Sequence, residues 1–236
     1  MGQSPTFMLK SQTEEDHEGL DQYFLSAWQG DSISLEYFLK QGMDVGRKNE
    51  LGSSALKMAS DHGHEDCVSI LLKHGAGNNM SDVSNSVTAA STRGHASCLK
   101  LLLPHVVENR TLKGPLFESC TSGSVDCVRL LVEKGADVNA RNNTGQTPLI
   151  LACFFGHSGC AEYLISKEAN LDLTDDRSNT ALYYASTRGH IKCVEALVYS
   201  GADQTAGSPI PQKCGTADIA EFLQNDRQTV TNFVLK

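Results

Sequence analysis

A glycine followed by a polar residue recurs along the chain at intervals close to 33 residues, and this periodicity restricts the fold more than any other feature. The intervals between successive glycines are 33, 31, 29, 33 and 33 residues. Such a period is typical of repeat proteins, in which one supersecondary unit is copied and each copy packs on its neighbours. The recurring pairs are Gly30-Asp31, Gly63-His64, Gly94-His95, Gly123-Ser124, Gly156-His157 and Gly189-His190.

Each of these glycines lies between two apolar segments that predict a pair of helices. After Gly123, the apolar residues of 127–132 follow the spacing of one helix face. This second helix ends at Gly135, which can adopt a positive φ and cap it, and the Asp that follows favours a turn. The segment 145–149, Gly-Gln-Thr-Pro-Leu, then starts the next helix, with proline in the first turn, where its missing N–H is tolerated. The repeating unit is therefore helix, turn, helix.

The segment 135–157 resembles the ankyrin repeat, because it contains Gly-Ala-Asp-Val-Asn-Ala, Gly-Gln-Thr-Pro-Leu and a closing Gly-His. The resemblance covers about residues 20–205 and implies an all-α ankyrin-repeat solenoid of helix-turn-helix units with short β-hairpin loops, about six repeats and a C-terminal capping helix. We expect the units at about 19–48, 49–80, 81–108, 109–141, 142–174 and 175–205, with a cap over 206–225, an acidic flexible tail over 1–18 and a C-terminal tail over 226–236.

The third unit departs from this pattern. It lacks the Thr-Pro-Leu start, and it ends in Leu102-Leu103-Pro104-His105 instead of a Gly-Ala-Asp turn. Proline cannot continue a helix, and the short interval leaves too few residues for a full hairpin. We therefore predict an irregular connection over His105 to Leu112 and a break in the regular stack at this point.

The cysteines could be read as metal ligands, because four of them follow a histidine at i+3. Each His–Cys pair supplies only two ligands, and the next pair lies one helix away, at about 8–10 Å, too far for one tetrahedral ion with bonds of about 2.0–2.3 Å. The same separation excludes disulfides along the row. We predict buried free thiols that replace the apolar residue of the family, structural histidines, and exposure of Cys214 alone. The row comprises Cys67, Cys98, Cys127, Cys160 and Cys193.

Charge and composition exclude several classes of function. The net charge of −8 disfavours a phosphate backbone as partner, so we expect no nucleic acid binding. No apolar run approaches the length of a bilayer span, and without a signal segment the free cysteines indicate a cytoplasmic or nuclear protein. Phosphate-loop, nucleophile-elbow and zinc-protease motifs are missing, so we expect a non-enzymatic monomer without cofactors.

The residues that can vary without harming an ankyrin stack lie at the loop tips and at the end of each first helix, just before the recurring glycine. Aromatic and arginine side chains at such places are the usual energetic anchors of protein interfaces. Trp28 could instead fill a gap in the N-terminal cap, and one of the two adjacent phenylalanines could pack inward. We predict partner contacts at Trp28, Arg93, Asn143, Thr144, Gln146, Phe154, Phe155, Arg177, Asn179 and Arg188.

Three residues are candidate modification sites. Asn139, eight residues after Leu131, resembles the hairpin asparagine that an oxygen-dependent asparaginyl hydroxylase modifies in animal ankyrin proteins, and Asn79 is a poorer match. Gly2 fits the loose N-myristoylation pattern. Without modification, both asparagines would be ordinary turn residues.

The resemblance implies a module that binds another protein on its concave face, as an adaptor, scaffold or inhibitor. The alternative is the substrate-recognition part of a ubiquitin ligase or a similar regulatory complex, with recruitment supplied by a tail or by a further domain. The identity of the partner does not follow from the sequence, because ankyrin stacks share a fold and not a ligand.

Overall fold

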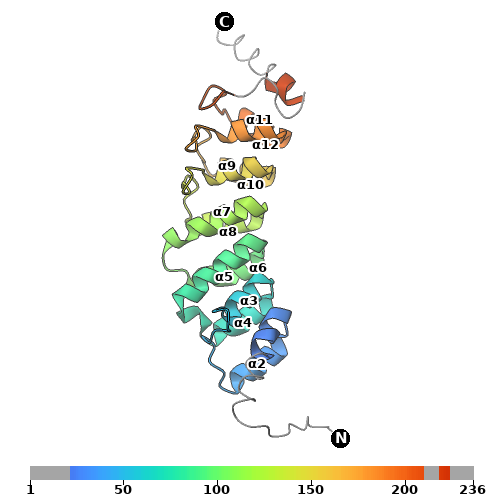
Figure 1. The fold of residues 1–236 in the computed structure, drawn as a ribbon, viewed down its shortest axis with the longest axis vertical. Coiled ribbons are helices and arrows are strands. Elements are labelled where there is room, and N and C mark those ends of the chain that lie inside the picture. The colour runs from blue at the N-terminus through green and yellow to red at the C-terminus, as the bar shows by residue number, and fades with distance from the viewer. Residues whose placement is uncertain (1–21, 210–217, 224–236) are drawn as a thin grey trace. The chain divides into compact units, whose positions relative to one another are not determined.

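The computed structural model describes residues 22–209 and 218–223, and it divides them into two compact units. The first unit comprises residues 22–90 and 97–106, and the second comprises 91–96, 107–209 and 218–223. Within these residues the chain forms helices and turns, with one isolated antiparallel bridge between Lys48 and Ser54 and no strand. The all-α prediction is confirmed, and short hydrogen-bonded turns occupy the places expected for β-hairpins (Figure 1).

The first unit begins with a helix over residues 22–29 and continues with α2 (Ser32–Lys40), α3 (Ala55–Asp61) and α4 (Glu65–Lys73). Helix α4 packs on both α2 and α3. A 3-10 turn, η1 (Ala76–Asn78), leads into α5 (Met80–Arg93), whose last residues belong to the second unit. Helix α6 (Ala96–Leu102) and η2 (Leu103–His105) complete the first unit.

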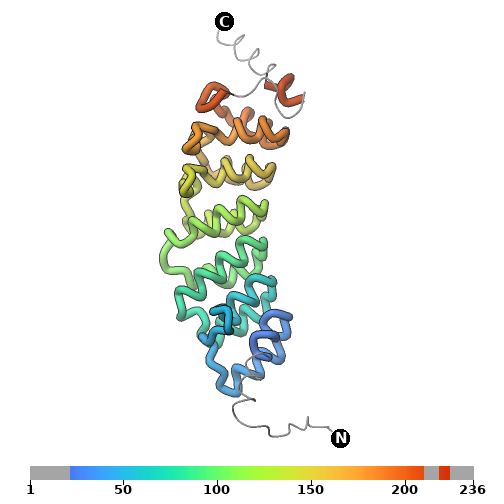
Figure 2. Tube along the Cα trace, viewed as in Figure 1, coloured from blue at the N-terminus to red at the C-terminus, as the bar shows by residue number. Residues whose placement is uncertain are grey.

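The second unit begins its regular repeats after η3 (Asn109–Leu112). Three helix pairs follow: α7 (Lys113–Ser122) with α8 (Val125–Glu133), α9 (Pro148–Phe155) with α10 (Ser158–Ser166), and α11 (Ala181–Arg188) with α12 (Ile191–Tyr199). Helix α9 packs on α7, α10 and α11, so the first helices form one layer and the second helices another. Figure 2 shows the loops that join successive pairs projecting on one side of this unit.

The recurring glycines end the first helices. Gly123, Gly156 and Gly189 all have φ values between 76° and 81°, and each caps its helix in the left-handed conformation. The histidines at the start of the second helices pack against the glycine of the preceding repeat, as His190 does on Gly156. The Nε2 of His157 also lies 3.0 Å from the carbonyl oxygen of Thr121. These contacts agree with the structural role predicted for the histidines.

The connection from the third to the fourth repeat is irregular, as the sequence predicted, because η2 and η3 occupy the segment where a Gly-Ala-Asp turn would stand. The connection before it is irregular too, and the sequence did not predict this. Asn79 caps the start of α5, since its Oδ1 accepts the N–H groups of Ser81 at 3.1 Å and Asp82 at 3.2 Å. The interpretation of Asn79 as a hairpin asparagine is therefore wrong.

At the C-terminal end, residues 218–223 are helical, and Ile219 and Leu223 are buried. They fall within the capping helix expected over 206–225. The tails predicted over 1–18 and 226–236, the myristoylation candidate Gly2 and the exposed thiol expected at Cys214 lie outside the described residues.

Candidate protein-binding surface

The end of α9 in the second unit carries two adjacent phenylalanines with different environments. The Phe155 side chain is 44% exposed, and its ring stacks on that of His157 with centroids 6.2 Å apart. The Phe154 side chain is only partly exposed, because its ring meets that of Tyr184 edge-on at 5.2 Å. Of the two, Phe155 is the one that offers an open apolar face, and Phe154 packs inward against α11.

Arg188, at the end of α11, lies over the ring of Phe154. Its guanidinium carbon is 3.5 Å from the centre of the Phe154 ring, a distance at which a cation is attracted to the face of the ring. Arg188 is exposed, and no carboxylate among the described residues pairs with it. The ring therefore holds the guanidinium in place while the N–H groups at its edge remain available to a partner.

Arg93 and Trp28 occupy the equivalent helix ends in other repeats. Arg93 ends α5 and is exposed in the second unit. Trp28, in the first unit, is 46% exposed, and its ring meets that of His62 edge-on at 5.3 Å. The Trp28 carbonyl oxygen lies 2.8 Å from the Nε2 of His64. The tryptophan is thus fixed through its backbone while much of its side chain faces solvent.

The loop before α9 presents the predicted tip residues. Asn143 and Thr144 are exposed, and Gln146 is half-buried. Asn142 organises the turn, because its Oδ1 accepts the N–H groups of Thr144 at 3.0 Å and Gln146 at 2.9 Å. In the next loop Arg177 is exposed. Asn143, Thr144 and Arg177 are thus exposed at the loop tips, and Gln146 is partly exposed.

Asn179 is different, and its prediction as a partner contact is wrong. The residue is only 8% exposed, and its Nδ2 donates to the hydroxyl oxygen of Tyr184 at 3.2 Å. The Tyr184 hydroxyl in turn donates to Asp175 Oδ2 at 2.6 Å, and the Asn179 backbone N–H donates to Asp175 Oδ1 at 2.9 Å. Asn179 therefore ties the loop to α11. The tyrosine five residues later was the signal that could have revealed this role.

Asn139 connects two repeats through its side chain. Its Oδ1 accepts the backbone N–H of Asn170 at 2.8 Å, and its own N–H donates to Asp137 Oδ1 at 2.9 Å. Asp172 makes the equivalent contact one repeat later, accepting the N–H of Asp203 at 2.8 Å. The Asn139 side chain is thus a structural link in the loop layer of the second unit.

All seven cysteines in the described residues are buried and free of disulfides. Burial raises the pKa of the Cys67 and Cys98 thiols to about 11 and that of Cys160 to about 12. Cys153 also has a raised pKa, caused by its hydrogen bond with Cys193 and by burial. Since the thiolate is the reactive form, the raised pKa makes the Cys67, Cys98, Cys153 and Cys160 thiols poor nucleophiles. The hydrogen bond with Cys153 instead lowers the pKa of the buried Cys193 thiol. No group of three or more His, Cys, Asp or Glu residues in the described parts could hold a metal ion.

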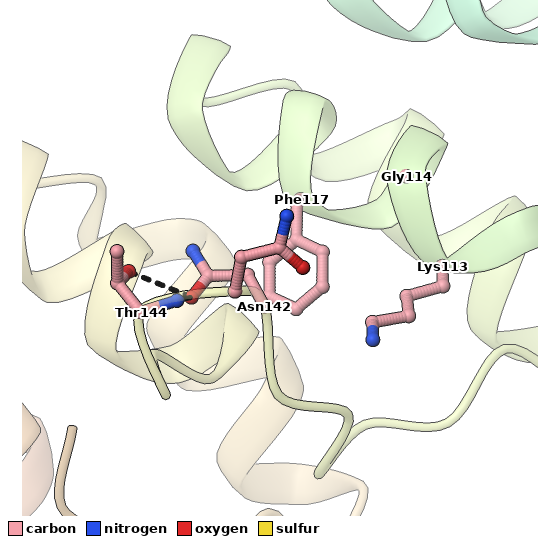
Figure 3. A pocket seen from close by; sticks show the side chains of 6 residues that line it. Lys113, Gly114, Phe117, Asn142 and Thr144 are labelled. Carbon is pink, nitrogen blue, oxygen red and sulfur yellow. Dashed lines mark hydrogen bonds between the residues drawn. The ribbon is translucent and has the colours of Figure 1, made fainter. Parts of the chain in front are cut away.

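A groove between the start of α7 and the loop that precedes α9 was missed by the sequence analysis. It has a volume of about 360 Å³ and is lined by Lys113, Gly114, Phe117 and residues 142–144 (Figure 3). Two of the predicted tip residues, Asn143 and Thr144, lie on its rim. A lysine and a phenylalanine four residues apart on one helix face were the only sequence signal for it.

Comparison with known proteins identifies the repeat. Ankyrin-repeat family models match residues 51–83, 82–142 and 140–207, which is more than half of the chain. An ankyrin repeat protein of Rickettsia felis is 28% identical over 124 residues, which cover 48% of this chain and 40% of that protein. The potassium channel AKT2/3 of Arabidopsis thaliana is 26% identical over 120 residues, which cover 49% of this chain and 15% of the channel. The chain thus spans less than half of either relative.

Solved structures support the same fold. The human ASB11 ankyrin repeat domain superposes with a TM-score of 0.74 at 22% identity, covering 85% of this chain and 96% of that domain. The ankyrin repeat domain of Bcl-3, a member of the IκB family, superposes with a TM-score of 0.70 at 21% identity, covering 86% and 97%. No helix within 22–209 or 218–223 is both long and apolar enough to span a membrane.

Proposed function

The chain belongs to the ankyrin-repeat family, and on this premise we propose that it is a non-catalytic module that binds another protein. Ankyrin repeats are protein-interaction modules in which a regular stack holds a variable surface. We place the principal contact surface of the second unit at the ends of its first helices, with Phe155 and Arg188 at its centre and Arg93 at the equivalent end of α5. The exposed loop tips, at the starts of α9 and α11, extend this surface. Trp28 supplies the equivalent contact in the first unit.

The observation that carries this proposal is the Phe154–Phe155–Arg188 group. The exposed Phe155 packs on Phe154, whose ring carries the Arg188 guanidinium, and no carboxylate in the described residues pairs with this arginine. Neither feature is needed to close the core, since Phe154 and Tyr184 already pack between α9 and α11. Aromatic and arginine side chains of this kind carry most of the energy in many protein interfaces.

The test is affinity capture from a cell extract with the full chain and with a Phe155→Ser, Arg188→Glu variant. We expect the variant to lose the captured protein and to keep its melting transition nearly unchanged, because both side chains lie on the surface. Phe154 stays unchanged in this variant, since replacing it would also remove its contact with Tyr184.

The matched control is a Leu51→Ser, Arg129→Glu variant. Leu51 is 88% exposed, and Arg129 lies over the Tyr163 ring at 4.8 Å, so this variant removes an exposed apolar side chain and a ring-bound arginine elsewhere. It should capture the same protein as the unchanged chain. Equal capture by all three proteins would contradict the proposed surface.

The proposal extends to the role and the location of the chain. We propose an adaptor, scaffold or inhibitor that acts as a monomer in the cytoplasm or nucleus, where reduced thiols such as its buried cysteines are usual. In the ubiquitin-ligase alternative, a tail or a further domain would recruit the rest of the complex. Residues 226–236, the C-terminal tail, lie outside the described part. We also propose Asn139 as a hydroxylation site, which mass spectrometry of the native protein would test.

A further inference from the structure

The groove of Figure 3 has an apolar floor and an open side. The ring of Phe117, only 9% exposed, forms the floor, and in this view Lys113 lies on one side of it and the 142–144 loop on the other. The volume of about 360 Å³ falls within the range of about 300–1,000 Å³ that is usual for binding pockets. The groove can therefore accept one or two side chains of a bound segment.

Gly114 keeps this groove open. A Cβ atom at this position would meet nothing within 4 Å, and the residue lies in the first turn of α7 without a positive φ. Glycine disfavours a helix by up to about 1 kcal/mol relative to alanine, so neither the backbone nor the packing requires it here. Its effect is to leave the part of the groove that it lines free of a side chain.

The polar groups on the rim divide into those already bonded and those available. The Asn142 side chain is used within the turn, and the Thr144 hydroxyl donates to Asn142 Oδ1 at 2.8 Å. The Lys113 ammonium and the Asn143 amide have no hydrogen-bond or ion-pair partner in the described residues. The groove thus offers one unpaired cation and one free amide next to an apolar floor.

We propose that this groove binds an extended segment of a partner protein in which an aliphatic or aromatic residue is followed, within two positions, by Asp or Glu. The apolar side chain packs on Phe117 and over Gly114, the carboxylate accepts from the Lys113 ammonium, and the Asn143 amide bonds a backbone group of the segment. A carboxylate of the segment would neutralise the Lys113 ammonium through a charge-assisted hydrogen bond. The inference rests on the proposed function, because it specifies the partner of the same unit.

The test uses the full chain and a series of groove variants. Gly114→Leu fills the groove, whereas Gly114→Ala adds one methyl group that leaves most of it open. Lys113→Glu reverses the charge on the rim, and its matched control is Lys192→Glu at an exposed site on α12. Each variant should remain folded, because these side chains contribute nothing to the core, and its melting transition checks this point.

The probe is a displayed library of random peptides of about twelve residues, which reach about 40 Å when extended. We expect the selected peptides to share an apolar residue followed by Asp or Glu. In fluorescence anisotropy, Gly114→Leu and Lys113→Glu should weaken the selected peptides at least about tenfold, which equals about 1.4 kcal/mol. Gly114→Ala and Lys192→Glu should bind like the unchanged chain.

The inference is overturned if no peptide is enriched, if the selected peptides lack the acidic residue, or if their binding survives Gly114→Leu. These results would leave the proposed function intact as long as the chain still captures a protein that the Phe155→Ser, Arg188→Glu variant loses. Failure of that capture is a separate result and would count against the proposed function itself.

Discussion

The cysteine at the same position of five successive repeats acts as a small apolar residue of the core. Cys67, Cys98, Cys127, Cys160 and Cys193 are all fully buried. A thiol in such a place is neutral, and ionising it would put an unsolvated charge between helices. Of these five, Cys67, Cys98 and Cys160 have pKa values raised above the ordinary 9.0 by burial, so the folded state keeps them protonated at higher pH.

These thiols predict that the protein loses stability at alkaline pH. The pKa is about 11 for Cys67 and about 12 for Cys160 in the folded chain, so the unfolded state releases protons first. Their contribution to the free energy of unfolding is complete below pH 9 and is lost as the pH rises toward these values. Urea denaturation at a series of pH values should show a midpoint that falls steadily above pH 9.

The control for this prediction is Cys160→Val, which keeps an apolar side chain in the same place and removes one titrating group. We expect a shallower fall of the midpoint above pH 9 in this variant than in the unchanged chain. Identical pH profiles for the two proteins would show that Cys160 does not contribute.

At the residue scale, the sequence could predict which side chains are buried in the helices but not which side chains form hydrogen bonds with one another in the loops. The burial of the cysteines could be predicted, because the position recurs in register with the apolar residues of a helix. Asn179 stands one 33-residue repeat after Gln146, yet Gln146 is half-buried and Asn179 is buried. The difference comes from the Tyr184 hydroxyl and the Asp175 carboxylate, which meet Asn179 only after the loop has folded against α11. The groove at Lys113 was missed for a similar reason, since the 142–144 loop completes it.

At the scale of elements, the recurring glycine ends a helix and contacts the next repeat. A Cβ atom on Gly156 would come within 2.6 Å of the His190 Nδ1, and its φ of 79° belongs to the left-handed region. Two different constraints therefore require glycine at this position. The spacing of the glycines in the sequence was sufficient to locate the helix ends, because only glycine satisfies both.

The same substitution at two glycines should have opposite effects. Gly156→Ala should destabilise the protein by at least about 1–2 kcal/mol, the cost of the left-handed conformation, since the His190 ring must also shift. Gly114→Ala should be neutral or stabilising by up to about 1 kcal/mol, because α7 gains a better helix former and nothing is displaced. Urea midpoints measured side by side test both, and a harmless Gly156→Ala would contradict the assigned contact.

The element that the sequence did not predict is the start of α5. Asn79 looked like a poorer match to a hairpin asparagine because it lies eight residues after Leu71, but its side chain caps the helix instead. Asp82, in the first turn of α5, is buried and paired with Lys48. This ion pair joins residues 34 positions apart, so no local pattern could indicate it.

At the scale of the whole molecule, the chain forms two compact units that each bury their own cysteines and apolar side chains. In repeat proteins the free energy of unfolding is approximately a sum of contributions from individual repeats and their nearest neighbours. A defect in one repeat is therefore felt most strongly in the repeats that adjoin it. This property separates a local loss of binding from a global loss of structure in any variant of the chain.

Cys160→Asp and Cys67→Asp form a matched pair that tests this expectation. Each places an unpaired carboxylate at a fully buried position, one on α10 in the second unit and one on α4 in the first. Because burying such a charge is strongly unfavourable, we expect Cys160→Asp to remove most amide protection from α9 to α12, and Cys67→Asp to do so in α3 and α4. Hydrogen exchange followed by mass spectrometry resolves the two regions. An unchanged exchange pattern around the substituted repeat would contradict the assignment of these cysteines to the core, and an equal loss in both regions for both variants would contradict the nearest-neighbour description.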